Sequence, residues 1–136
     1  MELNIRKLEA LDYEDILLKW WHDRGWSAPS KDFLPDNGTG GMIVYEKTIP
    51  VCAGFIYITN SNIAWVNWII SDKNYKDKGI RNDAITMLLN SLVNIAIGSN
   101  RTYVFAGNNN PSLIKRFIDF GFAKGNNDTT ELILKI

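Results

Sequence analysis

The chain has 136 residues, of which 46% are hydrophobic and 22% are charged. This length predicts a single domain, residues 1–136, and the composition excludes an intrinsically disordered chain. With 15 basic and 15 acidic residues the formal net charge is zero, which argues against stable nucleic-acid binding through phosphates.

Cys52 is the single cysteine, so no internal disulfide is expected. The first residues lack an apolar signal core, and no apolar run approaches the roughly 18–20 residues that a membrane span requires. We therefore expect a cytoplasmic protein without a membrane partner.

In chain order, alternating residues predict a first strand at 3–7. Asp12, with Asp15 three residues later, predicts a helix start, and Gly25 marks its end. The apolar face of this helix would consist of Ile16, Leu17, Trp20 and Trp21. Residues 26–41 are rich in Pro and Gly and predict a long loop, which in a compact domain is more often functional than idle.

The remaining pattern alternates strands with helices. The expected elements are strands at 42–45 and 51–58 joined as a hairpin, a strand at 63–70, a helix from Ile80 that ends at Gly98, a strand at 103–106, a helix from Pro111 to Gly121, and a final strand at 131–136. The segment from 63–70 through the long helix to 103–106 requires parallel pairing of its two strands. The order therefore predicts an α/β (α+β) fold with a mixed, mostly antiparallel central sheet, helices on both faces and one parallel strand–helix–strand crossover.

The residues between the strand at 63–70 and the long helix predict an anion site. Backbone N–H groups at a helix N-terminus, together with the helix dipole, attract anions, and Lys73, Lys76, Lys78 and Arg81 add positive charge. The alternative is a solvated lysine-rich turn before an ordinary helix.

Three motifs in this order resemble the GNAT superfamily of N-acetyltransferases over nearly the whole chain. They are the opening Ile-Arg-Lys-Leu at 5–8 followed by Asp12, the Tyr-Lys-Asp-Lys-Gly-Ile-Arg run at 75–81, and Asn110 followed after seven residues by Phe117 and then by Gly-Phe at 121–122. Small acetyltransferase-like proteins of bacteriophages are similar to this chain in the Trp-Trp-x-x-Arg-Gly-Trp pattern at 20–26.

The resemblance implies the GNAT fold and acetyl-coenzyme A as cofactor. The pantetheine arm would pair with the splayed strand at Trp68, Ile69 and Ile70. The pyrophosphate would lie at Lys76, Lys78, Gly79, Ile80, Arg81 and Asn82. Arg81 stands where the family has Gly or Ala, so it either crowds the phosphate or donates to it. Asn110 matches an asparagine that contacts the arm, and it is equally a plain helix cap before Pro111.

Acid and base residues of the family are missing here. Phe117 replaces the usual Tyr, and Asn67, the position nearest the usual Glu, cannot act as a base near neutral pH. The catalytic candidates are therefore His22, Tyr57 and Asn67, with Tyr103 and Glu131 as further ones. For His22 the alternative, a surface histidine on a polar helix face, is the favoured one, and Cys52 is expected to be a core residue.

Trp21, Arg24 and Trp26 are the candidates for contacts with the acceptor. Adjacent helical residues point about 100° apart, so Trp20 and Trp21 are not expected to share one core position. The alternative is that these aromatic side chains anchor the loop at 26–41.

The resemblance thus implies an acetyl-coenzyme A-dependent N-acyltransferase that transfers an acetyl group directly to a small-molecule or macromolecular amine. The rivals are a catalytically inactive binding module that contacts a host or viral protein, and a phage enzyme that modifies nucleobases. No metal site is expected, and the sequence leaves monomer and homodimer both open.

Overall fold

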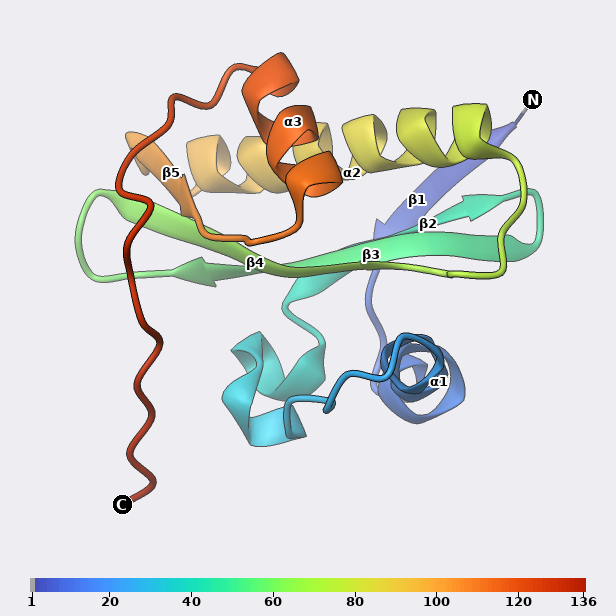
Figure 1. Cartoon of the computed structure of the whole chain (residues 1–136), viewed down its shortest axis with the longest axis horizontal. Helices are drawn as coiled ribbons and strands as arrows, with labels where there is room; N and C mark the ends of the chain where they lie inside the picture. Colours follow the sequence, from blue (N-terminus) through green and yellow to red (C-terminus); the bar gives the residue numbers. More distant parts are fainter. Residues whose placement is uncertain (1) are drawn as a thin grey trace.

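The computed structural model describes residues 2–136, which form a mixed five-stranded sheet with helices on both faces (Figure 1). The strands lie in chain order across the sheet: β1 (Leu3–Lys7), β2 (Gly41–Glu46), β3 (Ile49–Ile58), β4 (Ile63–Ser71) and β5 (Tyr103–Ala106). Neighbouring strands are antiparallel except for β4 and β5, which are parallel. The predicted fold class is confirmed.

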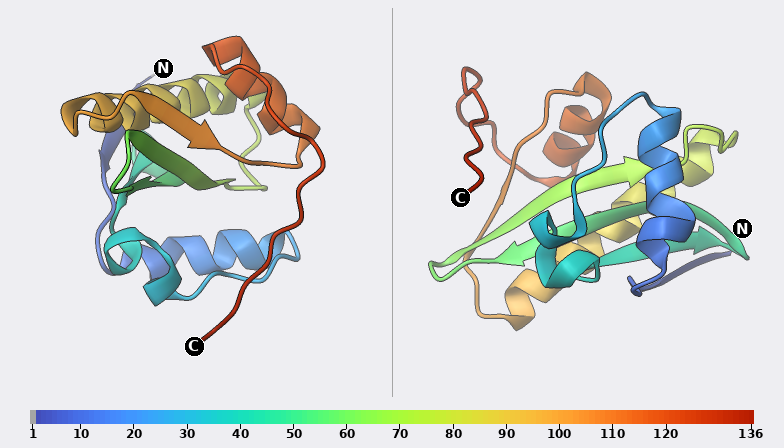
Figure 2. Two further views of the ribbon diagram at one scale, coloured as in Figure 1. Left: turned by 90° about the vertical axis from the view of Figure 1, so that its left-hand side faces the viewer. Right: turned by 90° about the horizontal axis from the view of Figure 1, so that it is seen from below.

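The helices divide between the two faces of the sheet (Figure 2). The crossover helix α2 (Lys78–Gly98) and α3 (Pro111–Phe120) cover one face. The other face carries a π-helical turn, η1 (Tyr13–Leu17), that continues into α1 (Leu18–Asp23), and the short η2 (Lys31–Phe33) and η3 (Pro35–Gly38) of the predicted long loop. No helix among residues 2–136 is long and apolar enough to cross a membrane.

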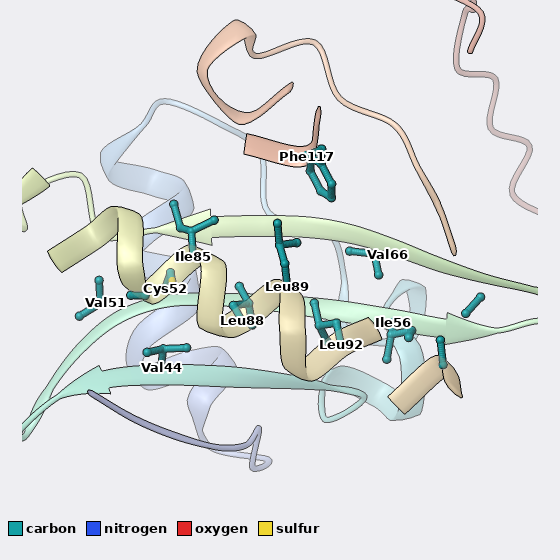
Figure 3. Close-up of a cluster of buried hydrophobic side chains, with 13 residues drawn as sticks. Val44, Val51, Cys52, Ile56, Val66, Ile85, Leu88, Leu89, Leu92 and Phe117 are labelled. Carbon is teal, nitrogen blue, oxygen red and sulfur yellow. The ribbon is translucent and has the colours of Figure 1, made fainter. Parts of the chain in front are cut away.

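Each face of the sheet has its own hydrophobic core. Figure 3 shows the core beneath α2, in which Leu88, Leu89 and Leu92 of the helix meet Val44, Ile56 and Val66 of the strands. The second core lies beneath α1 and contains Leu17, Trp20, Trp21, Leu34, Ile43, Phe55 and Ile70. Burial of apolar surface on both faces is the main stabilising contribution to this three-layer arrangement.

Trp20 and Trp21 are both buried, each with 3% of its surface exposed, which corrects the expectation that they would not share a core. The chain after α1 turns back over the helix, and the hydroxyl of Tyr13 donates to the carbonyl of Pro29 at 2.6 Å. Residues of this returning segment cover the second tryptophan, because Leu34 joins the same core.

Asp12 does not cap the helix that follows it, so that part of the prediction is wrong. Its carboxylate accepts two hydrogen bonds from Arg6, at 2.8 and 2.9 Å, and a third from the amide of Glu9 at 2.7 Å. Asp12 is the buried charged residue of the core, and Arg6 also donates to the hydroxyl of Tyr45. The ion pair thus ties the end of β1 to the first helix and to β2.

The predicted final strand at 131–136 does not form, and residues 121–136 contain no helix or strand. The segment is drawn in red in Figure 1, where it runs across the end of the sheet rather than along a strand. A strand needs a neighbour for its backbone hydrogen bonds, and this segment pairs with no strand among residues 2–136.

Cys52 lies in the core as expected, fully buried in β3. Burial raises the pKa of its thiol to about 12, although Arg81 opposes this slightly. We predict that iodoacetamide at pH 8 leaves the native protein unlabelled and labels Cys52 completely in guanidinium chloride, because only the exposed thiolate reacts. Mass spectrometry of the two samples checks this, and rapid labelling of the native protein would contradict it.

Candidate functional site

The two parallel strands β4 and β5 separate part of the way along β4. Their pairing runs from Ile63 opposite Tyr103 to Val66 opposite Ala106, where β5 ends. β4 continues to Ser71, and from Asn67 onward its only partner within the described residues 2–136 is β3. The outer edge of residues 67–71 is therefore free to bind an extended ligand through its backbone.

A β-bulge lies in this unpaired part of β4. Trp68 has a φ of 59°, and the register with β3 shifts between Ala53 and Phe55. Val66 and Ile69 consequently pack on the α2 face, whereas Trp68 packs on the α1 face. A positive φ is costly for a bulky residue, and such strain is typical of functional sites.

The indole of Trp68 is held by residues of the long loop and of β3. Its Nε1 donates to the hydroxyl of Tyr57 at 2.8 Å, and that hydroxyl donates to the carbonyl of Phe33 at 2.9 Å. The Phe33 ring meets the Trp68 ring edge-on at 6.0 Å. Burial raises the pKa of Tyr57, and the hydrogen bond from Trp68 opposes this in part. The two hydrogen bonds of the Tyr57 hydroxyl thus hold the loop at 26–41 against the bulged strand β4.

We predict that Tyr57→Phe lowers the free energy of unfolding by about 1–2 kcal/mol, because it leaves the donor of Trp68 and the carbonyl of Phe33 without their partner. Tyr103→Phe is the matched control, since Tyr103 is 65% exposed and its hydroxyl makes no hydrogen bond within residues 2–136. Urea denaturation of both variants measures the difference. Equal stability of the two variants would contradict this role for Tyr57.

Further aromatic side chains lie on the sheet beside the hydrogen-bonded pair of Tyr57 and Trp68. Trp65 stacks on Tyr57 at 4.9 Å and lies beside Phe105 in the register of β4 and β5. The Nε1 of Trp65 is buried and has no partner within residues 2–136. Trp65 and Phe33 were not among the residues expected at the site; their signal in the sequence was the second tryptophan, three residues before Trp68, in β4 and the apolar residue inside a polar loop.

The N-terminus of α2 follows the free edge of β4 in the chain. The Asp77 side chain caps it by accepting from the amide of Ile80 at 3.0 Å. The amides of Lys78 and Gly79 make no hydrogen bond within residues 2–136, and both residues are exposed. Two free donors, with the exposed ammonium groups of Lys76 and Lys78, therefore remain at this helix end.

Arg81 points into the loop that precedes α2. Its guanidinium donates to the carbonyl oxygens of Asp72, at 3.2 Å, and Tyr75, and its Nε is buried without a partner. The Arg81 side chain does not crowd the start of α2, and it does not extend from the helix toward a ligand. Neither of the two expectations for this residue is therefore met. It fixes the conformation of residues 72–75.

Arg24 fixes the same end of β4 from the other side. It donates to the carbonyl of Ser71 at 3.0 Å and to the Ser71 hydroxyl at 2.8 Å, and it lies over the ring of Trp26 at 5.4 Å. Burial, together with the nearby Arg81, lowers the pKa of Arg24. Of the three residues expected near an acceptor, Trp21 is buried in the core, Arg24 is committed to Ser71, and Trp26 is 49% exposed.

The other sequence candidates are spread over the molecule. His22 is exposed on α1, and Asn110 caps α3 through its carbonyl oxygen, which accepts from Ser112 and Leu113. Phe117 is buried against α2 and meets Phe122 edge-on at 4.9 Å. Glu131 lies in the exposed C-terminal segment. Residues 2–136 contain no cluster of His, Cys, Asp and Glu that suits a metal ion.

The sequence matches no protein-family profile. It also matches no curated protein. Solved structures, in contrast, match nearly the whole chain. N-acetylglutamate synthase from Neisseria gonorrhoeae, complexed with coenzyme A and N-acetyl-glutamate, aligns with a TM-score of 0.71 over 93% of this chain at 16% identity. This chain spans 29% of that synthase.

Two enzymes of more similar size align as well. An aminoglycoside acetyltransferase from an uncultured soil metagenomic sample has a TM-score of 0.68 and 14% identity over 98% of this chain and 97% of its own. The chain has the GNAT acetyltransferase fold. The ribosomal-protein-S18-alanine N-acetyltransferase from Escherichia coli shares this fold, with a TM-score of 0.65 and 14% identity over 92% of this chain and 80% of its own. At these identities the likeness concerns the GNAT fold alone.

Proposed function

We propose that the protein is an acetyl-coenzyme A-dependent N-acyltransferase that transfers the acetyl group directly to an amine. The observation that carries this proposal is the unpaired edge of β4 at residues 67–71, which leads along the chain to the free amides of Lys78 and Gly79. An extended arm with a diphosphate at one end fits such an edge followed by a helix N-terminus.

The residues present suit the parts of coenzyme A. The backbone of Trp68, Ile69 and Ile70 would hold the pantetheine arm, since these residues lack a strand on their outer side. The diphosphate would be held by the residues at the start of α2: Lys76, Lys78, Gly79, Ile80 and Asn82. Arg81 would act by holding the loop. Asn110 uses its oxygen as the cap, so its amide nitrogen is the atom left for the arm.

The chemistry that acetyl-coenzyme A supplies is an activated thioester carbonyl. Attack by a neutral amine would form the C–N bond and break the C–S bond, so that coenzyme A would leave as its thiolate, and the proton lost from nitrogen would neutralise that thiolate. The Tyr57 hydroxyl is committed to Phe33 and Trp68, so we propose that water carries this proton away. The acceptor would lie against the aromatic residues beneath the loop at 26–41, near Trp26.

Calorimetric titration with acetyl-coenzyme A tests the binding part of this proposal, and thiol release with a panel of primary amines tests the transfer. We expect binding at micromolar ligand and thiol release that depends on an amine. Lys7→Ala, at the opposite edge of the sheet, is the control for non-specific loss of charge. Absence of heat at saturating ligand concentration would overturn the proposal.

A second candidate is a GNAT-fold binding module without catalysis. Phe117 stands where the family resemblance places a proton-donating Tyr, and it is 7% exposed in the core. Asn67 likewise provides no base. Binding of acetyl-coenzyme A without turnover of any amine would favour this second candidate.

A further inference from the structure

The three strands nearest to the proposed thioester site carry no charged side chain. Residues 49–58 of β3, 63–71 of β4 and 103–106 of β5 contain no Asp, Glu, His, Lys or Arg. The hydroxyl of Tyr57 lies on the α1 face, but burial raises its pKa, and Phe33 and Trp68 already bond to it. These strands therefore offer no carboxylate or imidazole that could deprotonate an ammonium ion or form an ion pair with it.

The acidic and histidine side chains of the neighbouring elements are exposed or already bonded. The exposed ones are Asp15, His22, Asp32, Asp36 and Glu131. The bonded ones are Asp12 with Arg6, Glu14 with Lys31, Asp23 with Lys19, and Asp72 with the amide of Asn74. A hydrated or paired carboxylate is a weak base, because its charge is already stabilised. An amine that attacks beside residues 67–71 therefore has to arrive in its neutral form.

This requirement separates two classes of amine. An alkylamine such as the lysine side chain has a pKa of about 10.4, so that only about 0.1% of it is neutral at pH 7.5. An amine attached to an aromatic ring is far less basic, because its lone pair is delocalised into the ring, and it is neutral at this pH. A site without a base is thus suited to an arylamine.

A row of aromatic side chains crosses the same three strands. Tyr57 lies opposite Trp65, and Trp65 lies opposite Phe105, so the three side chains share the α1 face. Val104 and Ala106, on either side of Phe105, pack in the core of the α2 face, which confirms the alternation. The rings of Tyr57 and Trp65 lie 4.9 Å apart, and Phe105 is 60% exposed. We call these three residues the aromatic row.

The aromatic row lies at the start of the unpaired edge of β4. Trp65 is two residues before Asn67, where that edge begins, and Trp68 on the edge donates to Tyr57 in the row. Flat aromatic surfaces bind a planar ring by offset stacking, and they leave its substituents free to reach past them. A ring on this row would therefore present its amino group near residues 67–71.

We propose that the acceptor is an arylamine, whose ring stacks on the aromatic row and whose neutral amino group attacks the thioester beside Asn67. The inference rests on the proposed function, because it places the acceptor next to acetyl-coenzyme A. The nitrogen lone pair forms the C–N bond, the C–S bond breaks, and water carries the proton from nitrogen to the departing thiolate. The row binds the ring, the strand edge holds the thioester, and no side chain acts as a base.

The first experiment is thiol release at pH 7.5 with acetyl-coenzyme A and two amines that carry the same ring. In para-methoxyaniline the nitrogen is on the ring, and in para-methoxybenzylamine one methylene group separates them. We expect kcat/KM to be at least about tenfold higher for the aniline, because most of the benzylamine is protonated. Equal or faster release with the benzylamine would overturn the inference and leave the proposed function intact.

The second experiment measures ring binding without any turnover. Para-methoxyaniline is titrated into the full chain labelled with ¹⁵N, and the indole signals are followed by NMR. We expect the Trp65 signal to shift, whereas that of Trp20, which is buried beneath α1, stays in place. Phe105→Ala should weaken binding about fivefold, as loss of one aromatic contact predicts. Ile97→Ala is the matched control, since Ile97 is 63% exposed on α2 and lies on the other side of the sheet.

The results separate this inference from the function on which it rests. An unshifted Trp65 signal, or equal affinity of Phe105→Ala and Ile97→Ala, would overturn the arylamine alone. Absence of acetyl-coenzyme A binding in the calorimetric titration would overturn the transferase and the arylamine together. Melting temperatures of both variants check that the sheet is intact.

Discussion

Asp12→Ala is expected to lower the free energy of unfolding by about 3 kcal/mol, because it leaves the Arg6 guanidinium partly buried without its partner. The side chain of Asp12 is 8% exposed and that of Arg6 is 36% exposed, so solvent replaces the lost bonds only in part. For a domain of this size the loss corresponds to a melting temperature lower by roughly 10 °C. Thermal denaturation followed by circular dichroism measures it.

Asp119→Ala is the matched control, because Asp119 forms an ion pair with Lys115 in which both side chains are more than half exposed. Exposed pairs on a helix contribute about 0.5 kcal/mol or less. Similar losses in the two variants would contradict the special position of Asp12.

The same ion pair predicts a dependence of stability on pH. Burial by itself would raise the pKa of Asp12, but the hydrogen bonds from Arg6 and the Glu9 amide lower it below its ordinary value. The contribution of a carboxylate with a lowered pKa is complete above the unfolded pKa of about 3.9 and is lost as pH falls through the folded pKa. We expect Asp12→Asn to be less stable at neutral pH and to lose less stability than the wild type below about pH 4.

Lys78→Pro is expected to weaken acetyl-coenzyme A binding about tenfold more than Lys78→Ala does. Lys78 is the first residue of α2, where proline is well tolerated, and Asp77 before it is extended, with φ −83° and ψ 102°. Both variants remove the ammonium group, but only proline removes the free amide, whose hydrogen bond to a charged ligand is worth about 1.5 kcal/mol or more.

Calorimetry on the two variants gives the ratio, and melting temperatures check that α2 is intact. Lys7→Ala should bind as the wild type does. Equal affinities of Lys78→Pro and Lys78→Ala would show that the amide is not a ligand, and the diphosphate would then have to lie elsewhere.

The sequence predicted most of the fold because hydrophobic periodicity and Gly or Pro boundaries agree in most segments. The strand Tyr103–Ala106 was predicted with its observed bounds, and the helix predicted from Pro111 to Gly121 begins at Pro111 and ends at Phe120, with Gly121 as its C-cap. The failures have physical reasons. Residues 131–136 have the pattern of a strand, but pairing depends on a neighbour that periodicity does not supply. Asp12 has the spacing of a cap, but Arg6 competes for its carboxylate.

The site was less predictable than the fold, because it depends on contacts between distant segments. The free edge of β4 was expected from the resemblance, and the lysines at the start of α2 are visible in the sequence. The partners of Arg24 and Arg81 are backbone carbonyls of residues 71–75, which leave no trace in the sequence. The left-handed conformation of Trp68 is equally invisible, since bulky residues rarely adopt it.

Trp68 couples the conformation of the loop at 26–41 to that of the unpaired edge of β4. Its backbone forms the kink of β4, and its indole is tied through Tyr57 to Phe33 in the loop. Lifting the loop breaks this chain of hydrogen bonds and removes the ring that lies against the indole. The left-handed conformation of Trp68 costs about 1–3 kcal/mol. Without the contacts of the indole nothing offsets this cost, and the strand tends to straighten. A molecule that enters beneath the loop would thereby alter the spacing of the amides along residues 67–71.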